Sequence, residues 1–566
     1  MLHPDVSLPD LTPYAGRWIA VVRGCVVGVG LTPEEARLVA KRNRPKEEPA
    51  VQFVDPGLAD DAVAAADWFN PLEAGGDPLL AQIIRLFKEI GEPAYLVGGA
   101  VRDWLHGGGV LHPHDLDFVV PGDGLRLARQ IADALGGAFY PLDTERGVGR
   151  VVTAPKRKAP SPSAETARRV VDVAHFQGPD LTTDLAGRDF GVNAMALDVT
   201  SATPLLIDPH GGRADLQARR LRAISEEAIL NDPVRGLRAV RLQAQLGFEI
   251  EVRTQTLIRA AASGLALRPG GQVSAERIRD EFIRILTLPS VADSLRRLDE
   301  LNLLVEILPE VVALKGLAQT APRRQDVYEH TLQTAVELEA LLPLGGAPLH
   351  PKIPFPDRVA AHLAETVAGG HNRRLLLTLA AVLHDVGKRS TATREQSERI
   401  RFIGHNRAGA EVAADIMRQL RFSGEAVRRV EAIVLHHVRL LQPVWQGAIN
   451  KGMIHRFFRD LGDVGIDVTL LTLADHRATF GPDPGDGRWS LLLETASTLL
   501  DAYFNQRQTV VLPLPLLTGR DLIRQFGLAE GPEIGRLLAD LREAQAVGQV
   551  TSREEAETWV KRRTES

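Results

Sequence analysis

The sequence is poor in cysteine and in aromatic residues, and each shortage excludes a class of protein. Its 566 residues include one cysteine, Cys25, so neither an internal disulfide framework nor a zinc site built from several cysteines is possible. Aromatic residues make up 5% of the chain, which argues against rows of stacking rings for single-stranded nucleic acid. No apolar run approaches the roughly 20 residues that cross a bilayer, and the start lacks a signal-peptide pattern. We therefore expect a cytoplasmic protein with no membrane partner.

The rest of the composition is that of an ordinary globular protein of multidomain length. Hydrophobic residues make up 44% and charged residues 25% of the chain, and 566 residues exceed the roughly 100–200 of one domain. The net charge is −5, yet twelve arginines outnumber eight acidic residues between positions 213 and 280. Because nucleic acids are bound by a local basic face, this stretch is a candidate RNA-facing segment, although amphipathic helices often carry such a solvated face and charge alone favours that interpretation.

Hydrophobic periodicity predicts an α+β fold, and we expect six segments along the chain, whose divisions within the helical part follow from the family resemblance given below. Residues 18–22 and 25–29 alternate as two strands, and Thr32, followed by proline and two glutamates, marks the start of a helix. The segments are a small β-rich unit of unknown function at 1–54, a linker at 55–74, an α/β head at 75–212, a helical neck at 213–325, a helical domain at 326–500 and a helical tail at 501–566. Exposed loops are expected at 155–166, 343–371 and 481–488.

The head is predicted to be a mixed sheet with helices. Short β-rich runs alternate there with amphipathic helical patterns. The expected helices are 81–90, 100–105 and 124–135, and the expected strands are 94–97, 116–120, 138–141, 148–153 and 169–174.

The strongest functional signal is a glycine pair between a strand and a helix. Gly98 and Gly99 precede the helix 100–105, and glycines at such a bend let backbone amides approach a triphosphate at the helix N-terminus. A glycine pair alone is common in proteins. Its specificity comes from the acidic strand that follows.

That acidic strand carries Asp115 and Asp117. Side chains alternate along a strand, so both carboxylates point to one face and can share Mg²⁺ ions. One ion would activate an RNA 3′-hydroxyl and the other would hold the triphosphate. Asp172, on a later expected strand, is positioned to complete the cluster as a third carboxylate.

Together these residues closely resemble the tRNA nucleotidyltransferase and poly(A) polymerase family, in the branch typical of bacteria and eukaryotes. The resemblance continues through residues 184–196, 208–216 and 231–241. It implies a polymerase-β-like nucleotidyltransferase head and a neck that recognises the base and binds RNA. It also implies nucleotide-binding roles for Gly98, Gly99, Arg102, Arg188, Asp189, Asn193, Asp232, Arg235 and Arg238.

The resemblance assigns base recognition to Asp232 and Arg235. Residues spaced i, i+3 on a helix project to one side, so a carboxylate acceptor and a guanidinium donor can imitate a pairing base without a template. Three departures from the family pattern are present: Asn231 stands where an acid is usual, and Gly187 and Gly191 stand where arginine and threonine are common. We expect them to tune geometry or rate.

A second set of residues suggests a separate metal centre. His330, His384, Asp385 and Asp475 lie on successive expected helices, and such histidines and aspartates suit Mn²⁺, Ni²⁺, Fe or Mg²⁺. These four residues resemble the basic ligand set of the HD superfamily of metal phosphohydrolases. The additional residues His405, His436 and His437 would permit a two-metal site that hydrolyses phosphoesters such as 2′,3′-cyclic phosphates.

The combined resemblance covers residues 80–566 and implies the addition of C, A or both from CTP and ATP to the tRNA 3′ end. It leaves open full CCA addition against CC- or A-addition, and it is silent on the oligomeric state. The tail resembles a C-terminal element that helps to hold tRNA in bacterial relatives. Two alternatives are a bacterial poly(A) polymerase and a phosphohydrolase that keeps the head only to bind RNA.

Overall fold

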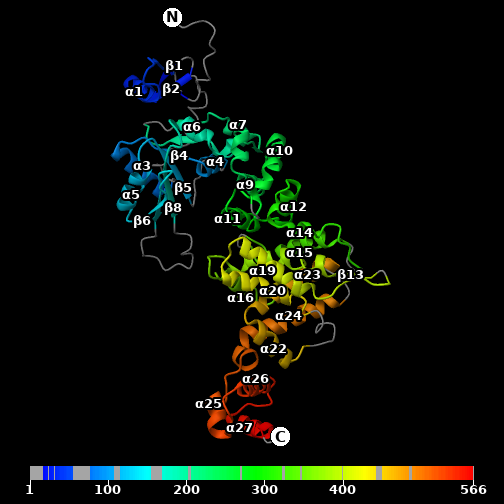
Figure 1. The fold of residues 1–566 in the computed structure, drawn as a ribbon. Coiled ribbons are helices and arrows are strands. Elements are labelled where there is room, and N and C mark those ends of the chain that lie inside the picture. Colours follow the sequence, from blue (N-terminus) through cyan, green and yellow to red (C-terminus); the bar gives the residue numbers. More distant parts are fainter. Residues whose placement is uncertain are drawn as a thin grey trace. The chain divides into compact units, whose positions relative to one another are not determined.

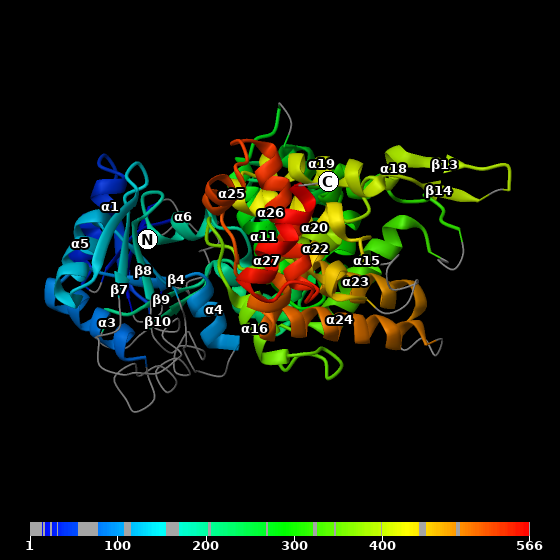
Figure 2. The same cartoon turned by 90° about the horizontal axis from the view of Figure 1, so that it is seen from below.

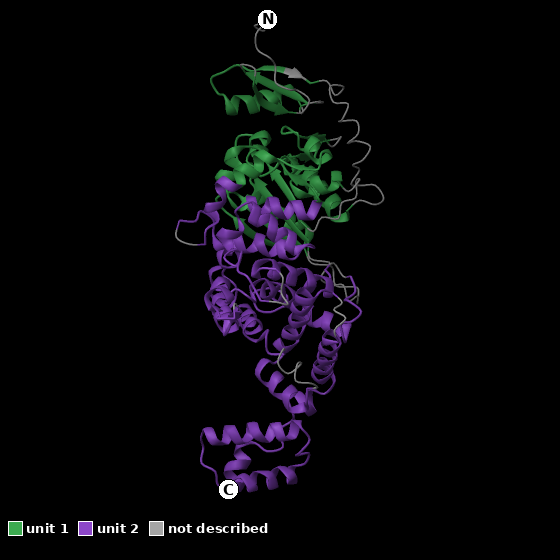
Figure 3. Cartoon of the chain, turned by 90° about the vertical axis from the view of Figure 1, so that its right-hand side faces the viewer, with its two compact units in different colours: residues 1–235, 247–258 green, residues 236–246, 259–566 purple. Residues whose placement is uncertain are grey.

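The computed structural model describes fourteen stretches of the chain in two compact units. The described residues are 14, 17–22, 25–30, 32–54, 77–106, 115–153, 169–201, 205–267, 270–320, 325–344, 347–397, 399–440, 449–482 and 487–564. One unit comprises residues 1–235 and 247–258, and the other comprises residues 236–246 and 259–566 (Figure 3). Among the described helices, none has the length and apolar character needed to cross a membrane.

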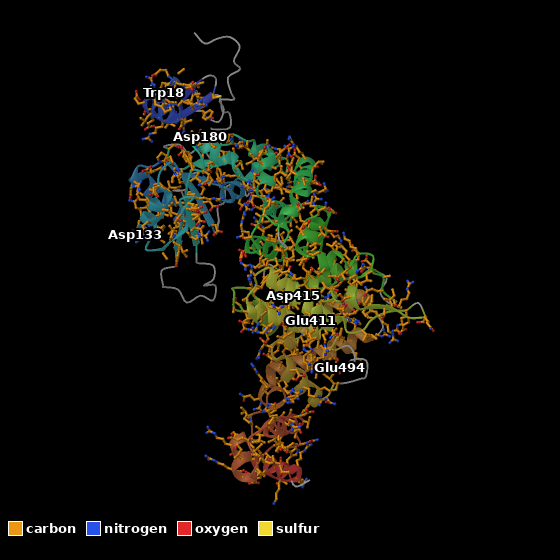
Figure 4. The ribbon with its side chains drawn as sticks, viewed as in Figure 1. Trp18, Asp133, Asp180, Glu411, Asp415 and Glu494 are labelled. Carbon is orange, nitrogen blue, oxygen red and sulfur yellow. The ribbon has the colours of Figure 1, made fainter. Side chains whose placement is uncertain are left out.

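The first unit begins with a small three-stranded sheet in the order β2-β1-β3. The strands are β1 (Trp18–Val22), β2 (Cys25–Gly30) and β3 (Ala50–Phe53), and α1 (Pro33–Asn43) packs on them. Trp18 is labelled on β1 in Figure 4. The side chain of Thr32 accepts a hydrogen bond from the Glu35 amide, so the expected helix start is confirmed.

The head is a seven-stranded mixed sheet in the order β10-β9-β4-β5-β8-β7-β6, and Figure 1 labels its strands β4, β5, β6 and β8. Only β5 and β8 run parallel to each other, and the other neighbouring pairs are antiparallel. This arrangement confirms the predicted mixed sheet. The strands are β4 (Tyr95–Val97), β5 (Asp115–Val120), β6 (Ala138–Asp143), β7 (Val148–Thr153), β8 (Arg169–His175), β9 (Ala196–Asp198) and β10 (Leu205–Ile207).

Three helices cover one face of this sheet, namely α3 (Pro78–Ile90), α4 (Gly99–His106) and α5 (Gly124–Leu135). Phe87 of α3 and Phe118 of β5 meet in that core with ring centroids 5.2 Å apart. A smaller apolar cluster that includes Val97, Val119 and Leu185 lies on the other face, beside α6 (Leu181–Ala186). Polar side chains that share a strand face with Val97 and Val119 therefore lie on the side with less helical cover.

Short elements connect the sheet to the second unit. They are a 3₁₀ turn at Gly191–Asn193, α7 (Gly212–Gln217), α8 (Glu226–Leu230), α9 (Val234–Leu246) and α10 (Val252–Ala261). A parallel pair of short strands, β11 (Arg220–Leu221) and β12 (Glu249–Ile250), interrupts this helical stretch.

Where the structure describes it, the second unit is helical apart from one hairpin. Its central helix is α23 (Val464–Phe480), which is buried on all sides from Gly465 to Arg477 and accordingly shows no amphipathic pattern. α23 packs mainly against α15 (Val327–Leu341), α17 (Arg373–Leu383), α20 (Gly424–His436), α22 (Lys451–Leu461) and α24 (Arg488–Asn505). Further helices of the unit are α11 (Ala275–Leu286), α12 (Val291–Glu300), α13 (Leu304–Ile307), α14 (Pro309–Val312), α16 (Pro356–Ala364), α18 (Lys388–Thr391) and α19 (His405–Gln419).

One expectation for this unit is wrong in detail. The stretch 343–371, expected to be a loop, contains α16, which begins with Pro356 at its first turn. Turn-forming residues in the local sequence obscured this short helix. A hairpin of β13 (Ala392–Arg394) and β14 (Ile400–Phe402) lies between α18 and α19.

The tail has a hydrophobic core of its own. A single π-helical turn at Arg507–Val511 leads to α25 (Gly519–Phe526), α26 (Pro532–Ala546) and α27 (Arg553–Thr564). Leu522, Leu541 and Val560 are fully or almost fully buried in this core. Thr518 and Asp521 form a capping box at the start of α25, which fixes the first turn of that helix.

Candidate functional site

Three carboxylates of the head share one face of the sheet. Asp117 of β5 lies directly opposite Asp172 of β8 in the parallel register, and directly opposed residues point to the same face. Asp115 precedes Asp117 by two residues on β5, so it points to that face as well. The structure thus brings together the three acidic residues that the sequence singled out.

The electrostatics of this cluster are those of a cation site. Burial, together with the charges of Asp172 and Asp115, raises the pKa of Asp117 to about 6, while Arg188 and Arg150 act in the opposite direction. Carboxylates packed closely on one face repel one another, and a divalent cation removes that repulsion. The donor set therefore fits a hard cation such as Mg²⁺, which prefers oxygen ligands.

The glycine bend lies beside this cluster. Val97 of β4 is opposite Asp117, and the next residue, Gly98, has a φ of +74°, a conformation that favours glycine. A Cβ atom at Gly98 would lie 3.3 Å from Arg188 Nη1 and 3.5 Å from Asp117 Oδ2. The bend thus lies against a carboxylate and a guanidinium group at once, the pair of charges that a metal–triphosphate complex requires.

A buried hydrogen-bond chain holds the motif residues behind the bend. Arg102 Nη1 donates to Asn193 Oδ1 at 2.7 Å, and Asn193 Nδ2 donates to Asp189 Oδ1 at 2.9 Å. All three side chains are buried. The chain therefore fixes α4, which follows the bend, relative to the segment that carries Arg188.

Arg235 is anchored on the backbone of that same segment. Its guanidinium donates to the carbonyl oxygens of Gly187 at 2.8 Å and Arg188 at 2.9 Å, and its Nε lies 3.5 Å from Asp232 Oδ2. The predicted base-reading pair is thus brought together. Arg238 belongs to the second unit, where its Nε lies 3.4 Å from Glu281 Oε1.

The structure also places two residues that the sequence analysis did not select. Arg150 of β7 forms two hydrogen bonds to Asp172, at 2.8 and 2.7 Å, and so it partly neutralises the third carboxylate. Asp184 of α6 accepts a hydrogen bond from Arg188 Nη2 at 3.3 Å. Arg150 carried no motif signal, because its role depends on strand register. Asp184 stands at the start of the 184–196 motif.

One departure from the family pattern has a local explanation. A Cβ atom at Gly191 would lie 2.4 Å from Asp215 Oδ2 and 3.3 Å from Arg222 Nη2. Asp215 is buried and paired with Arg222 at 2.8 Å. In this chain the Asp215–Arg222 pair occupies the space that a threonine at position 191 would need.

Six of the seven predicted metal ligands of the second unit meet in two adjacent groups. His330, His384 and Asp475 form one group, and Asp385, His405 and His437 form the other. In each group the ligand atoms lie within 4.8 Å of one another. Such spacing of imidazole nitrogens and carboxylate oxygens fits a divalent metal ion in each group.

Asp385 lies between the two groups. Its Oδ2 is 3.1 Å from His384 Nε2 and 3.7 Å from His330 Nε2. Its Oδ1 is 3.6 Å from His405 Nε2 and 3.9 Å from His437 Nε2. Each oxygen of one carboxylate therefore faces a different group, as a bridging ligand requires.

Backbone carbonyls orient three of the imidazole rings. The Nδ1 atoms of His384, His405 and His437 lie 2.7, 2.7 and 2.6 Å from carbonyl oxygens three residues earlier. Donation from Nδ1–H leaves the Nε2 lone pair facing the group, which is the tautomer that binds metal. Burial, reinforced by His384, lowers the pKa of His437 to about 3, so its ring is neutral at physiological pH.

His436 is not brought into either group. It is the last residue of α20 and is half-buried, and burial together with Arg439 lowers its pKa. Lys388, three residues after Asp385 in the sequence, was not predicted to belong to the centre, yet its Nζ lies 2.6 Å from Asp385 Oδ2 and 2.8 Å from Gln319 Oε1. It is therefore a further polar contact of the candidate metal centre.

Comparison with family models gives three matches. Residues 94–222 match the poly A polymerase head domain, residues 247–314 match the probable RNA and SrmB-binding site of polymerase A, and residues 358–478 match the HD domain. Members of the head and HD families typically use divalent metal ions.

Two curated relatives decide the family. The A-adding tRNA nucleotidyltransferase of Deinococcus radiodurans is 33% identical over 471 residues, which is 83% of this chain and 95% of the relative. The CC-adding enzyme of Thermus thermophilus is 34% identical over 468 residues, or 82% and 93% of the two chains. The chain belongs to the tRNA nucleotidyltransferase family. As a tRNA nucleotidyltransferase it is an enzyme, which favours the main prediction over the poly(A) polymerase and binding-module alternatives.

Solved structures share the transferase fold. A CCA-adding enzyme in apo form superposes with a TM-score of 0.56 at 20% identity, covering 86% of this chain and 95% of that one. The Thermotoga maritima CCA-adding enzyme, solved with tRNA_CCA, gives 0.53 at 19% identity, covering 87% and 97%. The α+β class expected of the transferase is thereby confirmed.

Proposed function

We propose that this tRNA nucleotidyltransferase adds C, A or both to the 3′ end of tRNA, with CTP and ATP as donors. The observation that best supports this proposal is that Asp115, Asp117 and Asp172 share one face of the sheet beside the Gly98 bend. The relatives named above are an A-adding and a CC-adding enzyme, and solved CCA-adding enzymes carry CTP, ATP or tRNA. Action on tRNA would place the enzyme in the cytoplasm.

The carboxylates would hold Mg²⁺, with Asp115 and Asp117 as ligands and Asp172 beside them. Bound magnesium supplies charge that stabilises the transition state of phosphoryl transfer. Backbone amides at Gly98 and Gly99, with the Arg188 guanidinium, would bind the triphosphate. The RNA 3′-oxygen then forms a bond to the α-phosphorus, the bond to pyrophosphate breaks, and the hydroxyl proton leaves for solvent.

Nucleotide selection would rest on Asp232 and Arg235. The guanidinium of Arg235 is fixed by two main-chain carbonyls, and a donor that is already immobilised loses little entropy when it meets a base edge. The buried chain of Arg102, Asn193 and Asp189 would position the ribose and phosphates.

A double variant tests the transfer site. Asp115→Asn with Asp117→Asn should retain tRNA binding and lose incorporation of CTP and ATP by more than a thousandfold, because both metal-binding charges are removed. Asp133→Asn is the matched control, since Asp133 is an exposed carboxylate of α5 (Figure 4). Products formed on tRNAs that end before each of the three terminal positions would be sequenced. Unchanged incorporation by the double variant would refute the assignment.

We propose further that residues 326–500, called the HD region below, bind two divalent ions, such as Mn²⁺, Ni²⁺, Fe or Mg²⁺, and hydrolyse phosphoesters. His330, His384 and Asp475 would hold one ion and His405 and His437 the other, with Asp385 between them. Bound ions supply a hydroxide nucleophile at neutral pH. His436, outside both groups, is left out of the proposed ligand set.

The segment boundaries expected from the sequence stand as a proposal, with residues 326–500 as the metal-binding domain. Residues 501–566 would contact the tRNA body. The structure gives that segment a core of its own, which supports treating it as a separate element.

A further inference from the structure

A basic hairpin adjoins the two histidine–aspartate groups. β13 and β14 pair with Ala392 opposite Phe402 and Arg394 opposite Ile400, and the hairpin extends away from the helices of its unit in both Figure 1 and Figure 2. The whole chain carries a net charge of −5, yet residues 388–407 contain six basic and two acidic residues. The basic residues are Lys388, Arg389, Arg394, Arg399, Arg401 and Arg407.

All five arginines of this segment are exposed to solvent. Arg401 lies 2.6 Å from Glu395, whereas neither Arg389 nor Arg399 forms an ion pair with any carboxylate that the structure describes. An exposed run of like charges is a site for a polyanion, because phosphate groups relieve the mutual repulsion and release counterions on binding.

The root of the hairpin is connected to the candidate metal centre. The Phe402 carbonyl lies 2.7 Å from His405 Nδ1. The ring of Phe402 lies 5.3 Å from Lys388 Nζ, and the same ammonium group is 2.6 Å from Asp385 Oδ2. One hairpin residue therefore contacts both a candidate ligand and the lysine beside the carboxylate between the two groups.

Solvent reaches the groups on the hairpin side. The side chain of His405 is 16% exposed, whereas those of the other five candidate ligands are between 1% and 7% exposed. His405 begins α19 three residues after the end of β14. A substrate that reaches the groups at His405 therefore comes close to the base of the basic hairpin.

We propose that the hairpin binds the sugar–phosphate backbone of a single-stranded RNA whose terminal phosphoester enters the HD site. This inference rests on the proposed hydrolase function and names its substrate class. β13 and β14 have three residues each, which span about 10 Å, so the hairpin can lie along more than one nucleotide of a chain. In hydrolysis, a water oxygen forms a new bond to phosphorus, and the ester oxygen leaves with the proton.

The test compares two probes that carry the same reactive group. A short oligoribonucleotide ending in a 2′,3′-cyclic phosphate and 2′,3′-cyclic AMP are hydrolysed by the full chain with Mn²⁺ or Ni²⁺. All proteins carry Asp115→Asn and Asp117→Asn to silence transfer. Exchanging Arg389, Arg394 and Arg399 for Gln should raise KM for the oligonucleotide about tenfold and flatten its salt dependence, while KM for cyclic AMP stays constant.

A matched triple variant removes three other arginines of the same unit. Arg418, Arg421 and Arg428 are exposed residues at the far end of the α19–α20 pair from His405, and their exchange for Gln should change neither KM. Arg418 pairs with Asp415, which is labelled in Figure 4. An equal rise in KM with the control variant, or no rise with the hairpin variant, would overturn the inference while leaving the hydrolase function intact.

A second measurement does not depend on hydrolysis. An oligoribonucleotide with 4-thiouridine near its 3′ end is cross-linked by light to the metal-free protein, and the attached peptides are identified by mass spectrometry. Attachment within residues 388–407 supports the inference, and attachment only elsewhere refutes it. If the metal-loaded protein hydrolyses neither probe, the proposed hydrolase function fails, and this inference fails with it.

Discussion

At the scale of single residues, a comparison of Gly98 with Gly91 distinguishes the effect of backbone strain from an effect on the transfer site. Gly98 and Gly91 have φ values of +74° and +76°. A Cβ atom at Gly98 would lie tightly against Arg188 Nη1 at 3.3 Å and in ordinary contact with Asp117 Oδ2 at 3.5 Å, whereas at Gly91 nothing lies within 4 Å. Alanine should destabilise the head by about 1 kcal/mol at either position. Only Gly98→Ala should raise KM for CTP and ATP, by roughly tenfold, because the new methyl group shifts the Arg188 guanidinium that would face the triphosphate.

Steady-state kinetics on a tRNA lacking its terminal nucleotides would measure this difference, with thermal unfolding as the control for strain. Equal kinetic losses for both variants would mean that Gly98 matters for folding alone. Unchanged KM in Gly98→Ala would remove the bend from the triphosphate site.

The raised pKa of Asp117 predicts how stability depends on pH. A carboxyl group whose pKa is about 6 in the folded state and about 4 when unfolded favours folding below pH 4, and this contribution is lost as the pH rises through 6. Metal-free Asp117→Asn should therefore be more stable than the parent at pH 7.5, by up to about 3 kcal/mol. The difference should vanish near pH 4.

Calorimetry in chelator at both pH values would test this dependence, with Asp133→Asn as an exposed control. Saturating Mg²⁺ should raise the unfolding temperature of the parent alone, because the Asn variant has lost a metal-binding charge. A variant less stable than the parent at pH 7.5 would contradict the proposed repulsion among the three carboxylates.

Adjacent histidines give the sharpest test of the second centre. His437 faces the ligand group and His436 does not, although they are neighbours in sequence. His437→Ala should lose at least half of the bound metal, measured by mass spectrometry of the purified protein, while His436→Ala should keep it. Equal metal contents in the two variants would refute the proposed ligand set.

At the scale of elements, close packing at Gly387 brings the start of α19 next to Asp385, which lies two residues before this glycine. A Cβ atom there would lie 2.1 Å from the His405 carbonyl oxygen. Gly387→Ala should therefore displace the start of α19 and lower metal content at least twofold. Gly404→Ala is the control, because Gly404 caps the same helix in the left-handed region with nothing within 4 Å. Amide hydrogen exchange across α19 would locate the displacement.

Sequence patterns predicted these elements wherever the signal was local. The helices and strands of the first unit followed from apolar periodicity and caps, as for the helix that Thr32 begins. The opposition of Asp117 and Asp172, and the pairing of Arg150 with Asp172, depend on strand register. Register is set by contacts between distant segments, so Asp172 was only a candidate and Arg150 was missed.

The difference between local signals and contacts of distant segments also explains the wrong predictions for the second unit. α16 lies in a Pro/Gly-rich stretch whose local propensity indicates a loop, yet Val359 and Leu363 of this helix are fully buried, so tertiary packing overrides the propensity. His436 and His437 are successive residues at a helix end, where side chains diverge by about 100°. Spacing alone could not decide which of them faces the metal groups.

At the scale of the whole molecule, two proposed chemistries occupy separate units of one chain. The carboxylates of the transfer site belong to residues 1–235, and the histidine groups belong to residues 259–566. The ligand sets share no residue, and the oxygen-only set selects harder cations than the imidazole-rich set. Each site should therefore keep its metal and its activity when the other is destroyed.

Reciprocal variants test this independence. Asp115→Asn with Asp117→Asn should leave the Mn²⁺ or Ni²⁺ content of the HD region unchanged, while His384→Ala with Asp385→Ala should remove that metal and change CTP and ATP incorporation less than twofold. Metal analysis and primer extension on the same preparations provide both readings. If the HD variant loses transfer in proportion to its metal although α15 and α23 keep their hydrogen-exchange protection, the second centre serves nucleotide addition and is not an independent hydrolase.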